Sequence, residues 1–185
     1  MTHFVETVIP GVILVEPPVH RDDRGFFLET YHESRYRDGG IRERFVQDNH
    51  SSSARNTLRG LHEQSPHPQG KLVRVIAGEV FDVTVDVRRG SPAYGKHFTM
   101  RLSADNFRQL YVPPGVLHGF LVTSDVAQFV YKCTDVYHPE AEFNVAWNDP
   151  DIGIEWPIES PILSEKDRCA PQLKDVEDRL IDYEP

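Results

Sequence analysis

Residues 71–87 read Lys-Leu-Val-Arg-Val-Ile-Ala-Gly-Glu-Val-Phe-Asp-Val-Thr-Val-Asp-Val, and this stretch decides the class of fold. Successive side chains of a strand point to opposite faces. Val80–Val87 is therefore predicted to be a strand with one face made by Phe81, Val83, Val85 and Val87 and the other made by Asp82, Thr84 and Asp86. Lys71–Ala77 is predicted to be a second strand. Because Gly78-Glu79 is typical of a tight turn, we expect the two strands to pair as a hairpin.

Alternating patterns and turn signals recur along the rest of the chain. Further strands are expected at Val12–Glu16, Gly25–Tyr31, Arg44–Asn49, Leu58–Glu63, Lys96–Leu102, Gln109–Val112, Gly119–Thr123 and Ala127–Thr134, with a polar Ser-rich turn before Leu58. Helical pattern is weak: Lys174–Ile181 predicts a short amphipathic helix, and His32–Tyr36 and Ser103–Phe107 predict about one turn each. About ten short strands with frequent turns predict an all-β jelly-roll barrel with a few short peripheral helices.

Length and composition fit one soluble globular domain spanning residues 1–185. We expect a C-terminal extension from about residue 165 to pack on the barrel. No apolar run approaches the ~20 residues that a membrane helix needs. The first residues lack the basic start and apolar stretch of a signal peptide. Two cysteines, Cys133 and Cys169, make neither a disulfide framework nor a metal cluster, so we expect reduced thiols and a cytoplasmic location.

The formal net charge of −9 argues against nucleic-acid binding, which depends on basic surface. It does not exclude an anionic ligand, because a few basic residues in a cleft can dominate the local field. Candidates for such a role are Arg24, Arg59, Lys71, Arg74 and Lys166, although most such residues are only solvated surface charges. No Gly-rich phosphate loop is present.

Two histidines stand out, His62 in Arg-Gly-Leu-His (59–62) and His118 in Pro-Pro-Gly-Val-Leu-His-Gly-Phe (113–120). A barrel that brings both to one interior face would hold two groups that titrate near neutral pH. Strand alternation places Arg59 and Leu61 opposite His62. His62 could be a buried core histidine or a general base, and a base needs an orienting carboxylate. Asp167 or Asp82 could supply it, and the sequence does not choose between them.

A catalytic metal is the alternative use of these histidines. Metal-binding barrels of this kind present two histidines two residues apart, but Gln64 occupies the second position here and Glu63 is expected on the face opposite His62. His62 and His118 alone fall short of the three protein ligands of catalytic zinc sites. A site with two histidines and a carboxylate for iron is conceivable but not favoured.

Two tyrosines add a possible proton donor and a possible stacking ring. Tyr131 is predicted to lie in a strand, and Tyr137 follows six residues later. Most tyrosines pack with a hydrogen-bonded hydroxyl group. A tyrosine beside two histidines inside a barrel could instead donate a proton to a carbanion, while Tyr137 could stack on a base.

The ordered motifs resemble those of the dTDP-4-dehydrorhamnose 3,5-epimerases, a family of cupin-fold enzymes. The matching segments are Asp23–Glu29, Phe45–Ser51, Leu58–His62, Gln69–Val75, Gly78–Val83, Pro114-Gly115, His118–Phe120, Tyr131–Thr134, Trp147–Pro150 and Leu163–Asp167. Each motif is weak alone, but together they are highly specific. The resemblance implies a cupin-type barrel that acts as a homodimer, with no cofactor and no metal, on a 4-keto-6-deoxyhexose carried by thymidine diphosphate.

The resemblance also implies a role for individual residues. It gives His62 as base, Asp167 as the carboxylate partner of that base, Tyr131 as proton donor and Lys71 as a substrate contact. Because a ketone at C4 of the sugar would form an enolate, we expect the cation of Lys71 to stabilise the enolate oxygen. The resemblance gives as further substrate contacts Arg24, Glu29, Gln47, Asn49, Arg59, His118, Glu142 and Lys166, with Tyr137 stacked against thymine. The implied reaction is inversion at C3 and C5 of dTDP-4-dehydro-6-deoxy-D-glucose.

Some positions depart from the family pattern. Glu63 replaces an aromatic or apolar residue, Val116-Leu117 replaces Phe-Ala, and Phe143–Ala146 replaces a more polar stretch. These changes could reshape the sugar pocket. The alternatives are therefore a mono-epimerase acting at C3 or C5 only, an isomerase that moves the keto group, a metal-dependent cupin enzyme, and a non-catalytic module that binds sugar nucleotides.

Overall fold

The segment around Gly78 crosses between two sheets. In the computed structural model, which describes residues 1–185, Lys71–Ala77 forms strand β7 and Glu79–Asp86 forms strand β8. They do not pair with each other: β7 pairs with β10 (Gln109–Val112) and β12 (Val126–Cys133), whereas β8 pairs with β9 (His97–Ser103) and β11 (Val116–Val122). The predicted hairpin is therefore wrong. Gly78 has φ of +75°, and a Cβ there would lie 2.1 Å from the carbonyl oxygen of Val126, so only glycine fits this crossing.

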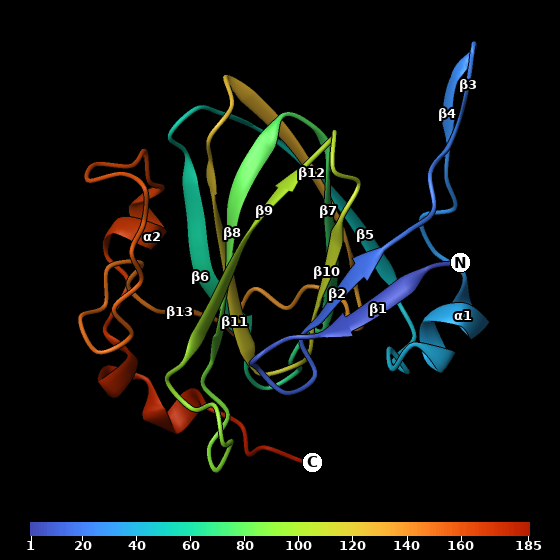
Figure 1. Cartoon of the computed structure of the whole chain (residues 1–185). Coiled ribbons are helices and arrows are strands. Elements are labelled where there is room, and N and C mark those ends of the chain that lie inside the picture. The colour runs from blue at the N-terminus through green and yellow to red at the C-terminus, as the bar shows by residue number, and fades with distance from the viewer.

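Two antiparallel sheets face each other and form the barrel (Figure 1). The six-stranded sheet has the order β1-β2-β10-β7-β12-β5, and the five-stranded sheet has the order β13-β6-β11-β8-β9. The strands not yet given are β1 (His3–Glu6), β2 (Ile13–Glu16), β5 (Gln47–Ala54), β6 (Leu58–Gln64) and β13 (Glu142–Asn144). The predicted all-β class with short peripheral helices is confirmed, and none of its helices is long and apolar enough to cross a membrane.

The barrel interior holds both an apolar cluster and a row of buried polar side chains. Its apolar part is a cluster of 13 buried residues from both sheets, including Val73, Val80, Val116 and Phe129. Val80 shares its face of β8 with Asp82, Thr84 and Asp86, which are fully buried. The polar row of the 71–87 stretch thus faces inward. Buried polar groups of this kind need partners, so their presence marks the part of the interior where a polar site can be built.

The apolar row of β8 packs outward against the C-terminal segment. Val83, Val85 and Val87 form a buried cluster with Leu173, Val176 and Leu180. This segment contains helix α2 (Glu165–Arg168) and two 3-10 turns, η1 (Leu173–Asp175) and η2 (Glu177–Arg179), in place of the single helix predicted at Lys174–Ile181. It covers the outside of the five-stranded sheet (Figure 1). Burying a valine or leucine side chain contributes about 1.5–3 kcal/mol, so these contacts stabilise the docked segment.

The other sheet is covered by the N-terminal part of the chain. Helix α1 (Glu33–Asp38) lies where a helical turn was predicted, and its Tyr36 is buried in a cluster with Ile13, Leu72 and Tyr111. Tyr36 donates a hydrogen bond to the carbonyl oxygen of Thr30, which fixes the helix to the segment before it.

Three predicted boundaries differ from the structure. The Ser-rich stretch at 51–53 belongs to β5, because every residue from Gln47 to Ala54 has a partner in β12. Of the predicted strand Gly25–Tyr31, only β4 (Gly25–Phe27) forms, as a two-stranded ribbon with β3 (His20–Asp22) that projects from the barrel (Figure 1). Residues 103–107 form a turn held by hydrogen bonds between Asn106 and Ser103.

Candidate active site

A cavity of about 360 Å³ opens between the two sheets. This volume is within the usual range of small-molecule sites, which is ~300–1,000 Å³. The side chains around it come mainly from β5, β6, β7, β11 and β12. Its lining residues are Gln47, Asn49, Ser51, Arg59, His62, Gln69, Lys71, His118, Phe120, Phe129, Tyr131, Tyr137, Glu142 and Lys166.

His62 is held by a buried carboxylate. Its Nε2 lies 2.5 Å from Oδ1 of Asp167, which is only 3% exposed and sits on α2. Ser164, the N-cap of α2, donates to Oδ2 of Asp167 and accepts from the Asp167 backbone N–H. Each Asp167 oxygen therefore has a defined partner. The C-terminal cover thus reaches the cavity and fixes the orientation of this imidazole.

Burial and hydrogen bonding have opposite effects on the pKa values of His62 and Asp167. Burial lowers the pKa of His62, although its hydrogen bond with Asp167 opposes that effect. Burial acts to raise the pKa of Asp167, but the hydrogen bond with His62 outweighs it, and the pKa of this carboxyl is lowered. A neutral imidazole beside an ionised carboxylate is the state that a general base requires.

An irregularity in β6 places Arg59 and His62 on the same side, contrary to the alternation expected from the sequence. His62 is opposite His118 in β11, but Arg59 is opposite Phe120, so the register shifts between these pairs. Gly60 allows it: a Cβ there would lie 2.6 Å from the Cα of Gly119. Both Arg59 and His62 consequently line the cavity.

His118 has its own buried carboxylate. Its Nε2 lies 3.0 and 3.1 Å from the two oxygens of Asp82, which is fully buried. Burial raises the pKa of Asp82, and the proximity of His118 opposes that rise. The strand pattern left both carboxylates open as partners of His62, and in the fold Asp167 pairs with His62 while Asp82 pairs with His118.

The arrangement of donors does not favour a catalytic metal at these histidines. The one group of three or more His, Cys, Asp or Glu side chains whose ligand atoms lie within 4.8 Å of one another is His67, Asp135 and His138. Neither His62 nor His118 belongs to it. Gln64 is not a candidate third ligand either, because its amide nitrogen donates to the carbonyl oxygens of His67 and Val136.

Lys71 brings a cation to the cavity beside His62. Its Nζ donates to the carbonyl oxygen of His62 at 3.2 Å and lies 3.9 Å from Oε2 of Glu63. Glu63 does not line the main cavity, and its Oε1 accepts from the backbone N–H groups of Gln64 and Gln69. Burial raises the pKa of Glu63, with the charge of Lys71 opposing it. The residue that departs from the family pattern therefore contacts the predicted enolate-stabilising lysine.

Tyr131 lines the same cavity as His62. Burial raises the pKa of Tyr131 to about 12, so its hydroxyl group keeps its proton at neutral pH. Its ring packs near Phe129, which stacks on Phe120 with a centroid separation of 4.2 Å. Sequence reasoning did not single out these two phenylalanines, nor Ser51 and Gln69. The spacing could have revealed the phenylalanines, since each lies two positions from His118 or Tyr131 on the same strand face.

The rim of the cavity is polar and hydrogen-bonded. Glu142 accepts from the hydroxyl of Tyr137 at 2.9 Å and from Nζ of Lys166 at 2.6 Å. Burial acts to raise the pKa of Glu142, but the hydrogen bonds from Lys166 and Tyr137 outweigh it and lower the pKa. Gln47 accepts from the backbone N–H of Tyr137 and donates to Asn49. The predicted contacts Gln47, Asn49, Glu142 and Lys166 thus lie together around Tyr137.

Arg24 and Glu29 are the predicted site residues that the fold does not bring to this cavity. Arg24 lies on the projecting β3–β4 ribbon, where its side chain is 90% exposed and paired with Asp22. Glu29 forms an ion pair with Arg35. Neither lines the cavity of the same chain. Both therefore stay predicted substrate contacts, and the ribbon that carries Arg24 extends away from the barrel of its own chain (Figure 1).

Comparison with known proteins gives one consistent family. The family described as dTDP-4-dehydrorhamnose 3,5-epimerase matches residues 6–175. The chain is similar to the dTDP-4-dehydrorhamnose 3,5-epimerase of Methanothermobacter thermautotrophicus, with 52% identity over 93% of this chain and 95% of that protein. It is also similar to the enzyme of the same name from Pseudomonas aeruginosa, with 53% identity over 91% of this chain and 94% of that protein.

Solved structures agree with the sequence comparisons. The crystal structure of an epimerase from Legionella pneumophila in complex with dTDP-4-keto-L-rhamnose is 46% identical, with a TM-score of 0.97 over 100% of both chains. This likeness confirms the expected cupin-type barrel. A 3'-monoepimerase from Streptomyces bikiniensis in complex with dTDP-quinovose is 34% identical, with a TM-score of 0.90 over 96% of this chain and 92% of that one.

Proposed function

The chain belongs to the dTDP-4-dehydrorhamnose 3,5-epimerase family, and from this premise we propose which residues perform the reaction. It is an isomerase that inverts C3 and C5 of dTDP-4-dehydro-6-deoxy-D-glucose to give dTDP-4-dehydro-L-rhamnose. The observation that carries the assignment of residues is one cavity lined by both His62, paired with Asp167, and the protonated Tyr131.

His62 is the general base in this proposal. The C4 ketone of the substrate acidifies the hydrogens at C3 and C5, because either carbanion delocalises onto the carbonyl oxygen. His62 removes each proton in turn and becomes an imidazolium ion. Asp167, 2.5 Å away, then stabilises that positive charge and keeps the ring aimed into the cavity.

Lys71 and Tyr131 complete the acid–base set. The ammonium group of Lys71 faces the cavity and stabilises the negative charge that develops on the enolate oxygen, a kind of electrostatic contribution that is often the largest single term. Tyr131 donates its proton to the carbon from the face opposite His62, which inverts the configuration. Before the second centre reacts, solvent takes the proton from the His62 imidazolium and returns a proton to the Tyr131 phenolate.

The polar rim positions the nucleotide. Tyr137 is half exposed, and its hydroxyl is held by Glu142, so its ring is available to stack on thymine. Arg59 and Lys166 provide positive charge for the diphosphate, and Gln47, Asn49 and His118 provide hydrogen-bonding groups. These contacts orient the sugar without taking part in the bond changes.

Hydrogen exchange from heavy water tests the assignment of the reaction. Incubation of dTDP-4-dehydro-6-deoxy-D-glucose with the enzyme in D2O should place deuterium at both C3 and C5, as read by NMR. Deuterium at one carbon only would assign the mono-epimerase reaction, which deserves the test because a 3'-monoepimerase is a structural relative. No deuterium at either carbon, with ligand affinity intact, would leave only the binding module. Activity that disappears on chelation and returns with iron, manganese or zinc would instead favour a metal-dependent cupin enzyme.

The pH dependence of kcat/KM should follow the ionisation of His62 and Tyr131. Since the base acts in its neutral form and burial lowers the pKa of His62, kcat/KM should rise through an acid limb below the ordinary imidazole range and be fully developed at neutral pH. It should fall only as Tyr131, with a pKa of about 12, ionises. Asp167→Asn removes a group that raises the His62 pKa, so its acid limb should move to lower pH while its plateau drops. A limb that stays in place or moves upward in this variant would contradict the pairing.

We further propose that the protein works as a homodimer in which the β3–β4 ribbon of one subunit reaches the cavity of the other. The ribbon projects from the barrel, and its Phe26 and Phe27 are 57% and 72% exposed. Large apolar side chains exposed on a projecting ribbon favour burial against another chain. This arrangement would deliver Arg24 and Glu29, which do not reach the cavity of their own chain.

Mixing two inactive variants tests the exchange of ribbons. Arg24→Ala and His62→Asn should each be nearly inactive alone. After unfolding and refolding together, mixed dimers would contain one site with both native residues, so about a quarter of the wild-type activity should return for random pairing. If Arg24 served its own subunit, no mixed dimer could contain an intact site and activity would stay at the level of the parents.

We also propose a single domain and a cytoplasmic location. The domain is taken as residues 1–185, since the segment from about residue 165 supplies Asp167 to the site. The cytoplasm is the proposed location, because the two cysteines are free thiols, one buried and one exposed, which suits a reducing compartment.

A further inference from the structure

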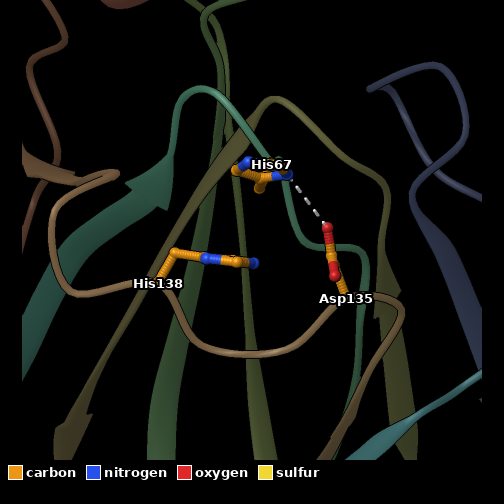
Figure 2. Close-up of side chains that lie close together, drawn as sticks. All are labelled: His67, Asp135 and His138. Atoms are coloured by element: carbon orange, nitrogen blue, oxygen red, sulfur yellow. Dashed lines mark ion pairs between the residues drawn. The ribbon is translucent and has the colours of Figure 1, made fainter.

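A second cluster of chemically active side chains lies beside the rim of the cavity and has no part in the reaction above. It consists of His67, in the loop after β6, and of Asp135 and His138, in the loop after β12. The imidazoles of His67 and His138 are stacked, with ring centroids 4.2 Å apart and an angle of 20° between the planes. Asp135 completes the group, with Oδ2 3.6 Å from Nδ1 of His67 (Figure 2).

We propose that these three side chains form a binding site for a divalent transition-metal ion of the zinc type. The ligand atoms all lie within 4.8 Å of one another. Tetrahedral zinc, with bonds of ~2.0–2.2 Å to nitrogen and oxygen, needs ligand atoms roughly 3.3–3.5 Å apart. Closing that difference requires the stacked rings to turn out of parallel, because an imidazole binds an ion in its ring plane, and the side chains of His67 and Asp135 are 52% and 39% exposed, which leaves solvent space for this turn. Two imidazoles and one carboxylate suit zinc and leave the fourth position to water.

The backbone beneath the cluster is fixed by two buried glutamines. Gln64 donates to the carbonyl oxygen of His67 at 2.8 Å and accepts from the backbone N–H of His138 at 2.7 Å. Gln69 donates to the carbonyl oxygen of Asp135 at 2.8 Å. Every residue of the proposed ligand set is therefore anchored by a glutamine that is at most 5% exposed. Such support lowers the cost of organising a metal site.

A further carboxylate lies where an orienting partner of a metal-bound histidine is normally found. Oε1 of Glu140 is 3.4 Å from Nδ1 of His138, which leaves Nε2 of that ring for the ion. Metal-bound histidines usually donate their other ring N–H to a carboxylate or carbonyl group, and this fixes the tautomer. Asp135 and Glu140 also make the local field negative, which favours a cation.

The consequence of metal binding would be a clamp on the rim. His67 and His138 belong to two loops that are far apart in the sequence, and Tyr137, which lines the cavity, lies between the ligands Asp135 and His138. An ion that joins the two loops would therefore restrict the segment that carries Tyr137. The binding itself does not depend on the proposed reaction and can be measured without substrate.

Calorimetric titration of the metal-stripped full-length protein with ZnCl2 tests the site. We expect one zinc ion per chain, a higher unfolding temperature in the presence of zinc, and at least a tenfold loss of affinity in His67→Asn and in His138→Asn. Glu140→Gln should weaken binding by about 10–100-fold. His20→Asn, which removes an exposed histidine on the ribbon, is the matched control and should bind zinc as the wild type does.

Three results would overturn the proposal. The first is the absence of stoichiometric zinc binding by the wild type. The second is wild-type zinc affinity in both His67→Asn and His138→Asn, and the third is loss of zinc affinity in His62→Asn; either of these two would place the ion elsewhere. Melting curves recorded without metal establish that the variants are folded, so a loss of affinity cannot be ascribed to unfolding.

Discussion

Replacing His62 with asparagine should lower kcat by about 10²–10⁴-fold, the usual contribution of a positioned general base. Asparagine can keep a hydrogen bond to Asp167 but cannot accept a proton from carbon. Deuterium incorporation at C3 and C5 should fall in parallel with epimerisation, because the same group starts both events. The rates are measured by coupling product formation to a reductase and by NMR of the substrate in D2O.

The control for this variant is a histidine outside the cavity. His97 lies on β9, does not line the site, and His97→Asn should leave kcat unchanged. Binding of thymidine diphosphate by His62→Asn should also remain, which separates loss of chemistry from loss of structure. A His62→Asn enzyme that keeps exchange at either carbon near the wild-type rate would remove this residue from the role of base.

Tyr131→Phe should lower the rate of inversion by about 10²-fold or more while exchange with solvent continues. The base can still remove a proton and return a deuteron to the same face of the carbon, which gives exchange without inversion. The ring of phenylalanine preserves the packing against Phe129. The measurement is the ratio of deuterium incorporated to product formed, which should rise strongly in the variant.

Tyr94→Phe provides the matched control, since this tyrosine is 41% exposed and does not line the cavity. Its ratio of exchange to inversion should equal that of the wild type. If inversion in Tyr131→Phe stays near the wild-type rate, the proton donor must be another group, and Tyr131 would have only a packing role.

The 71–87 stretch shows how far the sequence alone could lead. Alternation correctly predicted both strands and the composition of the two faces of β8, because those features depend only on the pleat. The partner of each strand was wrong, because a turn at Gly78 is compatible with a hairpin or with a crossing between sheets. The hairpin is excluded by long-range pairing, since β7 pairs with β10 and β12 in one sheet and β8 pairs with β9 and β11 in the other.

The candidate site was likewise predicted only in part from the sequence. Cavity residues such as His62, Lys71 and Tyr131 were predicted from ordered motifs, and the fold brings them together. The residues alone left open whether Asp82 or Asp167 is the partner of His62, because each carboxylate comes from a different element, and only the family resemblance indicated Asp167. Arg24 and Glu29 have the right motif but lie outside the cavity of their own chain, a question of assembly that no local pattern can decide.

The C-terminal segment that covers the five-stranded sheet also carries a residue of the proposed site, so its attachment to the barrel matters for activity. The peptide that packs Leu173, Val176 and Leu180 onto the outside of the barrel is the same peptide that carries Asp167. Peripheral segments open more readily than a central sheet. Proteolytic cleavage or mild heating that detaches this segment would leave an intact barrel with a misaligned His62 imidazole. Loss of activity should therefore precede loss of β-structure as the temperature rises.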